Sequence, residues 1–203
     1  MRSNTRTLCT YALVSLLALS PASGIAAAQT TSSSRATGDL SGIRIDNFGR
    51  LNPNYFRGGQ PKGRDFASLA KLGVKTVIDL QEDGDLGEAT LVSGAGMKFF
   101  RIPMNTRVVP TRAQLATFLK LVNDPANQPV YVHCAGGRHR TGVMTAVYRM
   151  TQEGWTPDKA FQEMKQYRFG ADFLHPEFKQ FVYAYRPEPA QPAEILVAGA
   201  ATQ

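Results

Sequence analysis

Two hydrophobic periods alternate along the chain. Short runs that are apolar, β-branched or alternating predict strands at residues 43–48, 74–80, 97–102 and 130–132. Apolar residues at helical spacing predict helices at 65–72, 88–92, 110–122, 141–151, 157–167 and 176–185. Strands that alternate with helices are typical of an α/β fold, in which helices cover both faces of a central, mostly parallel sheet. Ligands of such sheets bind at the carboxyl ends of the strands.

Turn and cap residues mark several boundaries of these elements. Gly73 is the expected C-cap of the first helix, and Thr156 is the expected N-cap of the fifth. Turns are expected at Gly49 and at 52–54. The segment 55–61, YFRGGQP, has two interpretations, which are a strand end with a tight turn and a loop that faces a substrate.

The two ends of the chain differ from its middle. Residues 1–28 combine early arginines, an apolar run and a small-residue series, which predicts a secretory signal peptide. The alternative is an uncleaved anchor, which needs about 20 apolar residues and is disfavoured because this run is shorter. We expect a flexible linker at 29–40, one globular domain at 41–186 and a flexible tail at 187–203. The expected location is therefore secreted or periplasmic.

Composition changes this picture in two ways. The chain has 203 residues and a formal net charge of +7, which favours anionic partners such as nucleic acid, phosphorylated substrates or acidic surfaces. It has two cysteines, and cleavage of the signal peptide removes Cys9, so that Cys134 is the single thiol of the mature chain. A lone thiol in an oxidising compartment has no disulfide partner and is exposed to oxidation, so we expect it to have a chemical function.

The stretch that follows the strand at 130–132 indicates a function for Cys134. It reads HCAGGRHRTG from His133 to Gly142. A strand, a loop with two glycines and a helix start form a cradle, in which backbone N–H groups and the helix dipole hold an anion. The same field favours the thiolate form of Cys134, which is the nucleophilic form. Arg140 offers a planar fork that matches two phosphate oxygens. The pattern indicates nucleophilic attack on phosphorus.

The stretch resembles the HCxxGxxRTG motif of the cysteine-dependent protein tyrosine and dual-specificity phosphatase superfamily. The segments NFGRLNPNYFRGGQP and LGVKTVIDL are similar to those of the plant and fungal atypical dual-specificity phosphatases and their bacterial relatives. The resemblance extends from about Ile43 to Tyr185. It implies a single phosphotyrosine-phosphatase-like domain and a phosphoric monoester hydrolase. We expect no cofactor and no metal.

The resemblance also implies roles for residues of the motif. Cys134 is the expected nucleophile, Arg140 holds the phosphoryl oxygens, Thr141 hydrogen-bonds Cys134, and His133 orients the loop through hydrogen bonds. The expected substrate-binding residues are Ala135, Gly136, Gly137, Arg138, His139 and Gly142.

One departure from the family pattern concerns the general acid. Most members carry an Asp on a mobile loop about thirty residues before the Cys, where it protonates the leaving oxygen. The corresponding loop here is 102–110, IPMNTRVVP, which has Asn105 and no carboxylate. Either the substrate has a leaving group that needs no acid, as in phosphoanhydrides, or another residue serves. The candidates are Asp79, Asp83, Asp85 and Asp172.

The expected function is that of an exported phosphatase acting on phosphorylated proteins or inositol phosphates, with no role in nucleic-acid binding and no stable membrane insertion after signal cleavage. A catalytically weak or inactive phosphate-binding module of the same fold is the alternative. A rhodanese-like sulfur carrier is disfavoured because Arg140-Thr141 suits phosphate. A metal hydrolase is disfavoured because the three histidines lack ligand spacing. The sequence does not indicate an oligomeric state.

Overall fold

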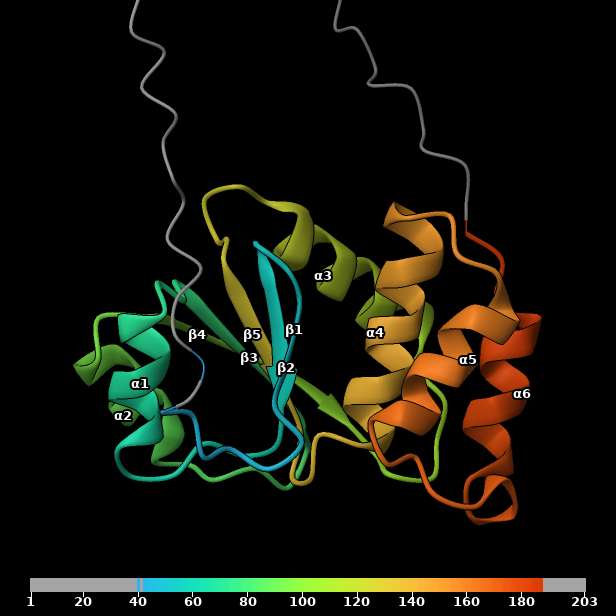
Figure 1. The fold of residues 1–203 in the computed structure, drawn as a ribbon, viewed down its shortest axis with the longest axis horizontal. Coiled ribbons are helices and arrows are strands. Elements are labelled where there is room, and N and C mark those ends of the chain that lie inside the picture. The colour runs from blue at the N-terminus through green and yellow to red at the C-terminus, as the bar shows by residue number, and fades with distance from the viewer. Residues whose placement is uncertain (1–39, 41, 188–203) are drawn as a thin grey trace, which may run out of the picture. The chain divides into compact units, whose positions relative to one another are not determined.

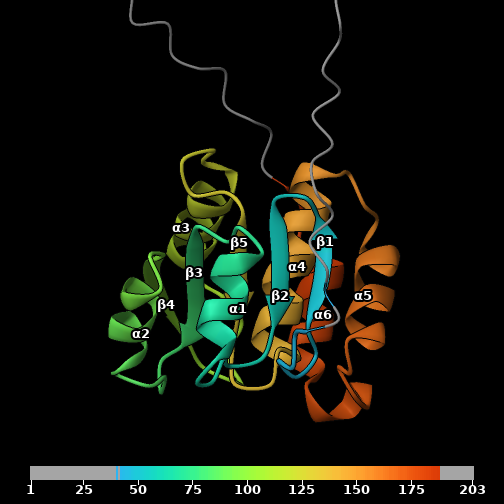
Figure 2. The ribbon, with the colours of Figure 1, turned by 60° about the vertical axis from the view of Figure 1, so that its left-hand side comes forward.

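The computed structural model describes residues 40 and 42–187. One five-stranded sheet runs through it in the order β1-β2-β5-β3-β4 (Figures 1 and 2). The β1–β2 pair is antiparallel and the other three pairs are parallel. The strands are β1 (Gly49–Asn52), β2 (Tyr55–Gly58), β3 (Thr76–Gln81), β4 (Lys98–Met104) and β5 (Val130–His133). The predicted mostly parallel sheet is confirmed.

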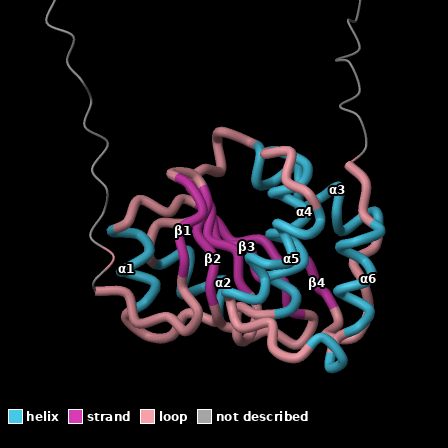
Figure 3. The backbone as a smooth tube through the Cα atoms, turned by 45° about the vertical axis from the view of Figure 1, so that its right-hand side comes forward, coloured by secondary structure: helices cyan, strands magenta, loops and turns pink. Residues whose placement is uncertain are grey.

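Helices cover both faces of the sheet, as the alternating pattern predicts (Figure 3). One core lies under α1 and α2, a second lies under α3 and α4, and a third joins α4 to α5 and α6 on the outside. The helices are α1 (Asp65–Lys71), α2 (Glu88–Gly94), α3 (Arg112–Asn123), α4 (His139–Gln152), α5 (Pro157–Gln166) and α6 (Pro176–Ala184), with a short 3₁₀ turn at Asp172–Leu174. Helix α4 is therefore buried between the sheet and two further helices.

The N-caps of two helices follow the sequence. The Thr111 hydroxyl accepts a hydrogen bond from the Gln114 backbone amide, and the Gln114 side-chain oxygen accepts one from the Thr111 backbone amide. The Thr156 hydroxyl likewise accepts from the Lys159 amide, with Pro157 in the first helical position. Side-chain caps satisfy amides that the first turn of a helix leaves without a partner.

The first strand differs from the prediction. Residues 43–48 are not a strand, and the first strand is β1, which begins at Gly49, where a turn was expected. The cause is Asn47, which has a left-handed φ of 56° and donates from its side chain to two carbonyls elsewhere in the fold. An extended strand cannot continue through that conformation. Segment 55–58 is strand β2, and all four of its residues are buried.

Several sequence predictions concern residues that lie outside the described part of the chain. These are the signal peptide at 1–28, nearly all of the linker at 29–40, and the tail from residue 188 onward. Among the described residues, no helix combines the length and the apolar character needed to cross a bilayer.

The middle of the sheet sets the place of the candidate site. Strand β5 lies between β2 and β3, and its carboxyl end leads into the loop before α4 (Figure 1). Side chains of a strand point alternately to its two faces. Val130, Val132 and the following Cys134 accordingly belong to the core under α3 and α4, whereas Tyr131 belongs to the core under α1 and α2.

Candidate active site

The loop between β5 and α4 surrounds a small hollow. Its volume is about 200 Å³, and Cys134 lies at its base with 3% of its surface exposed. Arg140 enters from the first turn of α4, and Thr106 enters from the loop after β4. The hollow is also lined by Ala135, Gly136, Arg138 and His139. The thiol, the Arg and the start of a fourteen-residue helix therefore meet at one point, which suits an anion.

Gly137 gives the loop its shape. Its φ is +63°, in the left-handed region that disfavours other residues. A Cβ atom at this position would lie 2.3 Å from the carbonyl carbon of Gly58, at the end of β2. At Gly137 the backbone of the loop therefore packs directly against the backbone at the end of β2, and only glycine, which has no side chain, fits there.

Buried polar side chains hold this turn in place. The carbonyl of Gly137 accepts hydrogen bonds from the Arg57 guanidinium and from the Asn47 amide, the latter at 2.7 Å. Arg57 is fully buried in β2, with its guanidinium carbon 4.0 Å from the centre of the Tyr167 ring. Arg57 is thus a support of the loop and does not face the hollow.

The backbone after β2 adds to this support. The Gln60 amide donates to the carbonyl of Ala135 at 3.1 Å, and the Tyr131 hydroxyl donates to the carbonyl of Gly59 at 2.6 Å. Of the two interpretations of segment 55–61, the structure favours the strand end with a tight turn, because this turn lies under the loop and braces it.

Arg140 is nearly buried and held by two acceptors. Its Nη1 atom donates to the carboxylate of Asp83 and to the carbonyl of Met104, each at 3.1 Å. The side chain of Arg140 is 5% exposed, and that of Asp83 is 72% exposed. The Arg140 hydrogen bond holds the pKa of the Asp83 carboxyl below its ordinary value.

Two expected roles within the motif are not found in the structure. The Thr141 hydroxyl is buried and makes no hydrogen bond to Cys134 or to any other described residue. Gly142 lies within α4, where its amide donates to the Arg138 carbonyl and the Met164 side chain packs against it. Gly142 is therefore a packing residue between α4 and α5 and does not line the hollow.

His139 does line the hollow, and its side chain is half-buried. Its Nε2 lies 2.9 Å from the Phe169 carbonyl, which can only accept, so this nitrogen is the donor. The ring centre lies 3.8 Å from that of His175. Burial lowers the pKa of His139, and the neighbouring His175 lowers it further.

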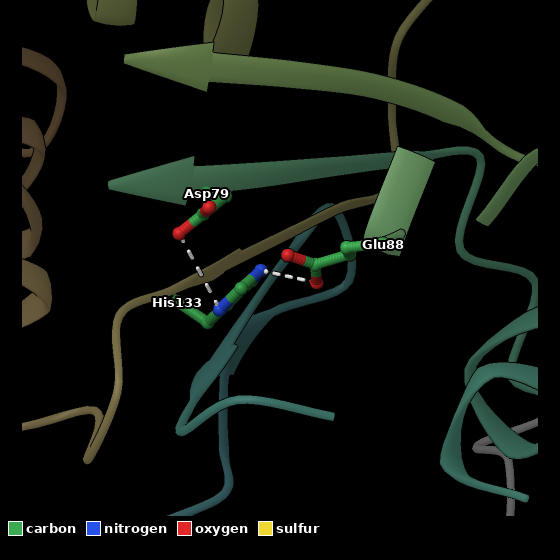
Figure 4. Close-up of side chains that lie close together, drawn as sticks. All are labelled: Asp79, Glu88 and His133. Carbon is green, nitrogen blue, oxygen red and sulfur yellow. Dashed lines mark ion pairs between the residues drawn. The ribbon is translucent and has the colours of Figure 1, made fainter. Parts of the chain in front are cut away.

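His133 points to the opposite face of the sheet from Cys134, because the two are consecutive and Cys134 belongs to the core under α3 and α4. Figure 4 shows His133 between Asp79 and Glu88. Its Nε2 is 3.0 Å from Glu88 of α2, and its Nδ1 is 3.9 Å from Asp79, its register partner on β3. All three side chains are fully buried. His133 was expected to orient the loop by hydrogen bonds, but the structure pairs it with two carboxylates beneath the loop.

The cluster of Asp79, Glu88 and His133 is the one group of described residues whose ligand atoms lie close enough for a metal. The two carboxylates face different nitrogens of the imidazole, as Figure 4 shows, so one ion cannot bind the nearest atoms of all three. Arg101 already contacts Asp79 at 2.8 Å and Glu88 at 3.9 Å. Arg101 therefore already balances part of the negative charge of the two carboxylates, and the cluster is better described as a buried ion network.

The four candidate acids fall in different places. Asp79 belongs to the buried network. Asp85 accepts from the Gly87 amide at 2.8 Å in the same exposed loop as Asp83. Asp172 is bound by Lys165 and Lys179, which lower its pKa. Asp83 alone of these four contacts a residue that lines the hollow.

Sequence reasoning missed several residues that shape this site. Glu88 was assigned only to a helix, and Asn47, Arg57 and Thr106 were given no place at the loop. The position of Asp79 opposite His133 follows from parallel pairing of two strands whose side chains alternate. The other contacts join segments far apart in sequence and carry no local signal.

Comparison with known proteins places this geometry in a family. Residues 44–180 match the family described as "DSP-PTPase phosphatase fused to NAD+ Kinase". The chain belongs to this family. The dual specificity protein phosphatase TpbA of Pseudomonas aeruginosa is 31% identical over 127 residues, which cover 61% of this chain and 56% of TpbA. The chain thus matches little more than half the length of that relative.

Two solved structures have the same fold. The core catalytic domain of the PP-IP phosphatase SIW14 from Saccharomyces cerevisiae, in complex with citrate, has a TM-score of 0.63 and 25% identity, covering 71% of this chain and 88% of that one. TpbA in complex with pTyr has a TM-score of 0.59 and 26% identity, covering 68% of this chain and 83% of that one. The expected phosphotyrosine-phosphatase-like fold is confirmed.

Replacing Gly137 tests the loop that this DSP-PTPase fold depends on. We expect Gly137→Ala to lower the free energy of unfolding by about 1–3 kcal/mol, because a positive φ and a clash with Gly58 both oppose a side chain. Gly136→Ala is the matched control, since a Cβ there would lie 3.4 Å from the Arg138 side chain, at an ordinary contact distance. Denaturant unfolding measures both. Equal stability of the two variants would contradict this account of the loop.

Replacing Glu88 tests the buried network under His133. We expect Glu88→Gln to lower the free energy of unfolding by about 3 kcal/mol, because it removes the buried carboxylate that faces both Arg101 and the His133 ring. Glu177→Gln removes the partner of the more exposed His175 and is expected to cost less than about 1 kcal/mol. The same unfolding measurement compares them, and a Glu88→Gln protein as stable as the control would argue against the network.

Proposed function

We propose that this chain is a cysteine-dependent phosphatase that hydrolyses phosphate monoesters through a cysteinyl-phosphate intermediate. The observation that carries the proposal is the placement of Cys134 and Arg140 on one hollow, at the carboxyl end of the central strand and the start of α4. Membership of the DSP-PTPase family and the likeness to TpbA support the same reaction.

Each part of the hollow has a role in this reaction. The Cys134 thiolate attacks phosphorus, and the Arg140 guanidinium holds the equatorial oxygens as charge is redistributed among them. Backbone amides from Ala135 to Arg140 complete the anion cradle.

The proposed substrates are phosphorylated proteins, at tyrosine or at serine and threonine, and inositol phosphates. A family relative is named a dual specificity protein phosphatase, and one solved neighbour is named a PP-IP phosphatase. The rim of the hollow also carries Arg138, whose side chain is 46% exposed and forms an exposed ion pair with Asp46 at 3.6 Å. A cation at the rim favours substrates with more than one negative charge.

The N-terminal sequence supports a place of action outside the cytoplasm. The arginines, the apolar run and the small residues that end at Ala28 are the features of a cleaved signal peptide. We therefore propose that the phosphatase acts in the periplasm or is secreted.

A phosphate-binding module with little or no turnover is the second candidate. The loop after β4 has no carboxylate, which favours this alternative. Such a module would keep the cradle and Arg140 and would bind inorganic phosphate without releasing it from an ester.

Cys134→Ser decides between the two candidates. We expect the wild-type protein to release phosphate from p-nitrophenyl phosphate and from at least one member of a panel of phosphopeptides and inositol phosphates. The serine variant should lose this activity and still bind inorganic phosphate, because the cradle is intact. Activity should persist in a chelator. A wild-type protein that binds phosphate without any turnover would support the module, and loss of activity in chelator would contradict the cysteine mechanism.

Export is tested separately by the mature N-terminus. When the full chain is expressed with its leader in a Gram-negative host, we expect N-terminal sequencing of the periplasmic or secreted protein to begin at Gln29. A protein retained with Met1 at its N-terminus would contradict the proposed export and leave the proposed reaction unaffected.

A further inference from the structure

The loop after β4 offers no proton donor for a leaving oxygen. Asn105 occupies it, and its amide donates to Glu82 at 2.6 Å, which ties this loop to the one after β3. From the loop after β4, Thr106 lines the hollow, but its hydroxyl is a poor acid at neutral pH. A phosphate monoester with an ordinary alcohol as leaving group still requires a proton.

The loop after β3 brings a carboxylate to the same place. Asp83 lies 3.1 Å from the Nη1 atom of Arg140, the residue that is to hold the phosphoryl group. Of the described carboxylates, it is the one in ion-pair contact with Arg140. The Asp83 side chain is 72% exposed, so it is free to change rotamer when Arg140 binds another anion.

The topology of the sheet explains why this loop lies so close. Strand β3 is hydrogen-bonded to β5 and pairs Asp79 with His133, whereas β4 lies one strand further out. The residues just beyond the end of β3 therefore emerge beside those just beyond the end of β5, where Cys134 and its loop begin. A proton donor on the loop after β3 therefore lies close to the hollow, although this loop is far from Cys134 in the sequence.

We propose that Asp83 is the general acid of the reaction and that a bound phosphoryl group releases it from Arg140. The inference rests on the proposed function. A phosphate dianion binds the Arg140 guanidinium in place of Asp83. The Asp83 carboxyl is then free and lies at the open rim of the hollow, beside the leaving oxygen. One residue thus holds Arg140 before substrate arrives and supplies the proton afterwards.

The steps balance in protons and electrons. Once the phosphoryl group has displaced it from Arg140, the Asp83 carboxylate takes up a proton from solvent. As the Cys134 thiolate forms the S–P bond, the P–O bond to the leaving group breaks, its electron pair stays on the oxygen, and the Asp83 carboxyl supplies that proton. A water molecule then attacks phosphorus and gives its proton to the Asp83 carboxylate. The P–S bond breaks, and inorganic phosphate and the thiolate are released with Asp83 protonated again.

The charges around Asp83 favour this exchange. Arg140 alone lowers its pKa by a direct side-chain hydrogen bond. The neighbouring charged groups are Glu82 and Asp85 on its own loop, Arg140 of α4, and Arg101 of β4, which binds the Asp85 carbonyl. Replacing the Arg140 contact by a nearby phosphate dianion raises the pKa of Asp83, since a like charge disfavours the carboxylate.

The experiment compares Asp83→Asn with Asp85→Asn, a matched change in the same exposed loop. Both are assayed with phenyl phosphate and with p-nitrophenyl phosphate, whose leaving group needs little protonation. We expect Asp83→Asn to lower kcat/KM for phenyl phosphate by about 100-fold, to lower it much less for p-nitrophenyl phosphate, and to remove the basic limb of the kcat/KM pH profile, because kcat/KM reports the step in which the leaving group departs. Asp85→Asn should retain the wild-type ratio between the two substrates.

Binding of inorganic phosphate supplies a readout that needs no turnover. We expect Asp83→Asn to bind phosphate at least as tightly as wild type, because a competitor for Arg140 is gone. Carboxyl carbon NMR of the Cys134→Ser protein should show a higher pKa for Asp83 when phosphate is bound.

The outcomes separate this inference from the proposed function. An inactive wild-type protein contradicts the proposed function, and the role of Asp83 as an acid falls with it. An active wild-type protein whose Asp83→Asn variant loses kcat/KM equally with both esters, or loses none, overturns the role of Asp83 alone. An Asp83 pKa that does not rise when phosphate binds overturns the release from Arg140.

Discussion

The close approach of two backbones, at Gly137 in the loop and Gly58 at the end of β2, is the constraint on which the rest of the site depends. A loop that turns through a positive φ against another strand end has no room for a side chain, and its carbonyl must find donors in the interior. Arg57 and Asn47 supply them. The charged side chain buried in β2 is thereby explained, because it satisfies the turn that shapes the anion cradle.

Because side chains alternate along β5, the consecutive residues at its end point to opposite faces of the sheet. Cys134 faces α4 and the hollow, and His133 faces α2 and two buried carboxylates. The buried network under His133 is joined through Arg101 to the loop that carries Asp83, because Arg101 also binds the Asp85 carbonyl. The base of the cradle and its rim are therefore connected through one arginine on β4.

Much of this arrangement follows from the sequence. The periods of 2 and 3.6 place the sheet and the helices, and the HCAGGRHRTG stretch brings Cys134 and Arg140 together between a strand and a helix. The sequence fails at 43–48, where the left-handed Asn47 breaks an alternating run that looks like a strand. It also fails for the hydroxyl of Thr141, because a position next to Arg140 on a helix does not determine where a side chain points. The contacts of Arg57, Glu88 and Asp83 depend on strand order, which a local pattern does not specify.

The central claim is that Cys134 forms a covalent bond to phosphorus within this cradle. Rapid acid quenching of the wild-type protein during turnover of p-nitrophenyl phosphate, followed by mass spectrometry of its peptides, tests it most directly. The account predicts one added phosphoryl group on the peptide that contains Cys134, and none on that peptide in the Cys134→Ser protein. Turnover without any phosphorylated Cys134 peptide, or a phosphoryl group on another residue that follows the kinetics of turnover, would contradict it.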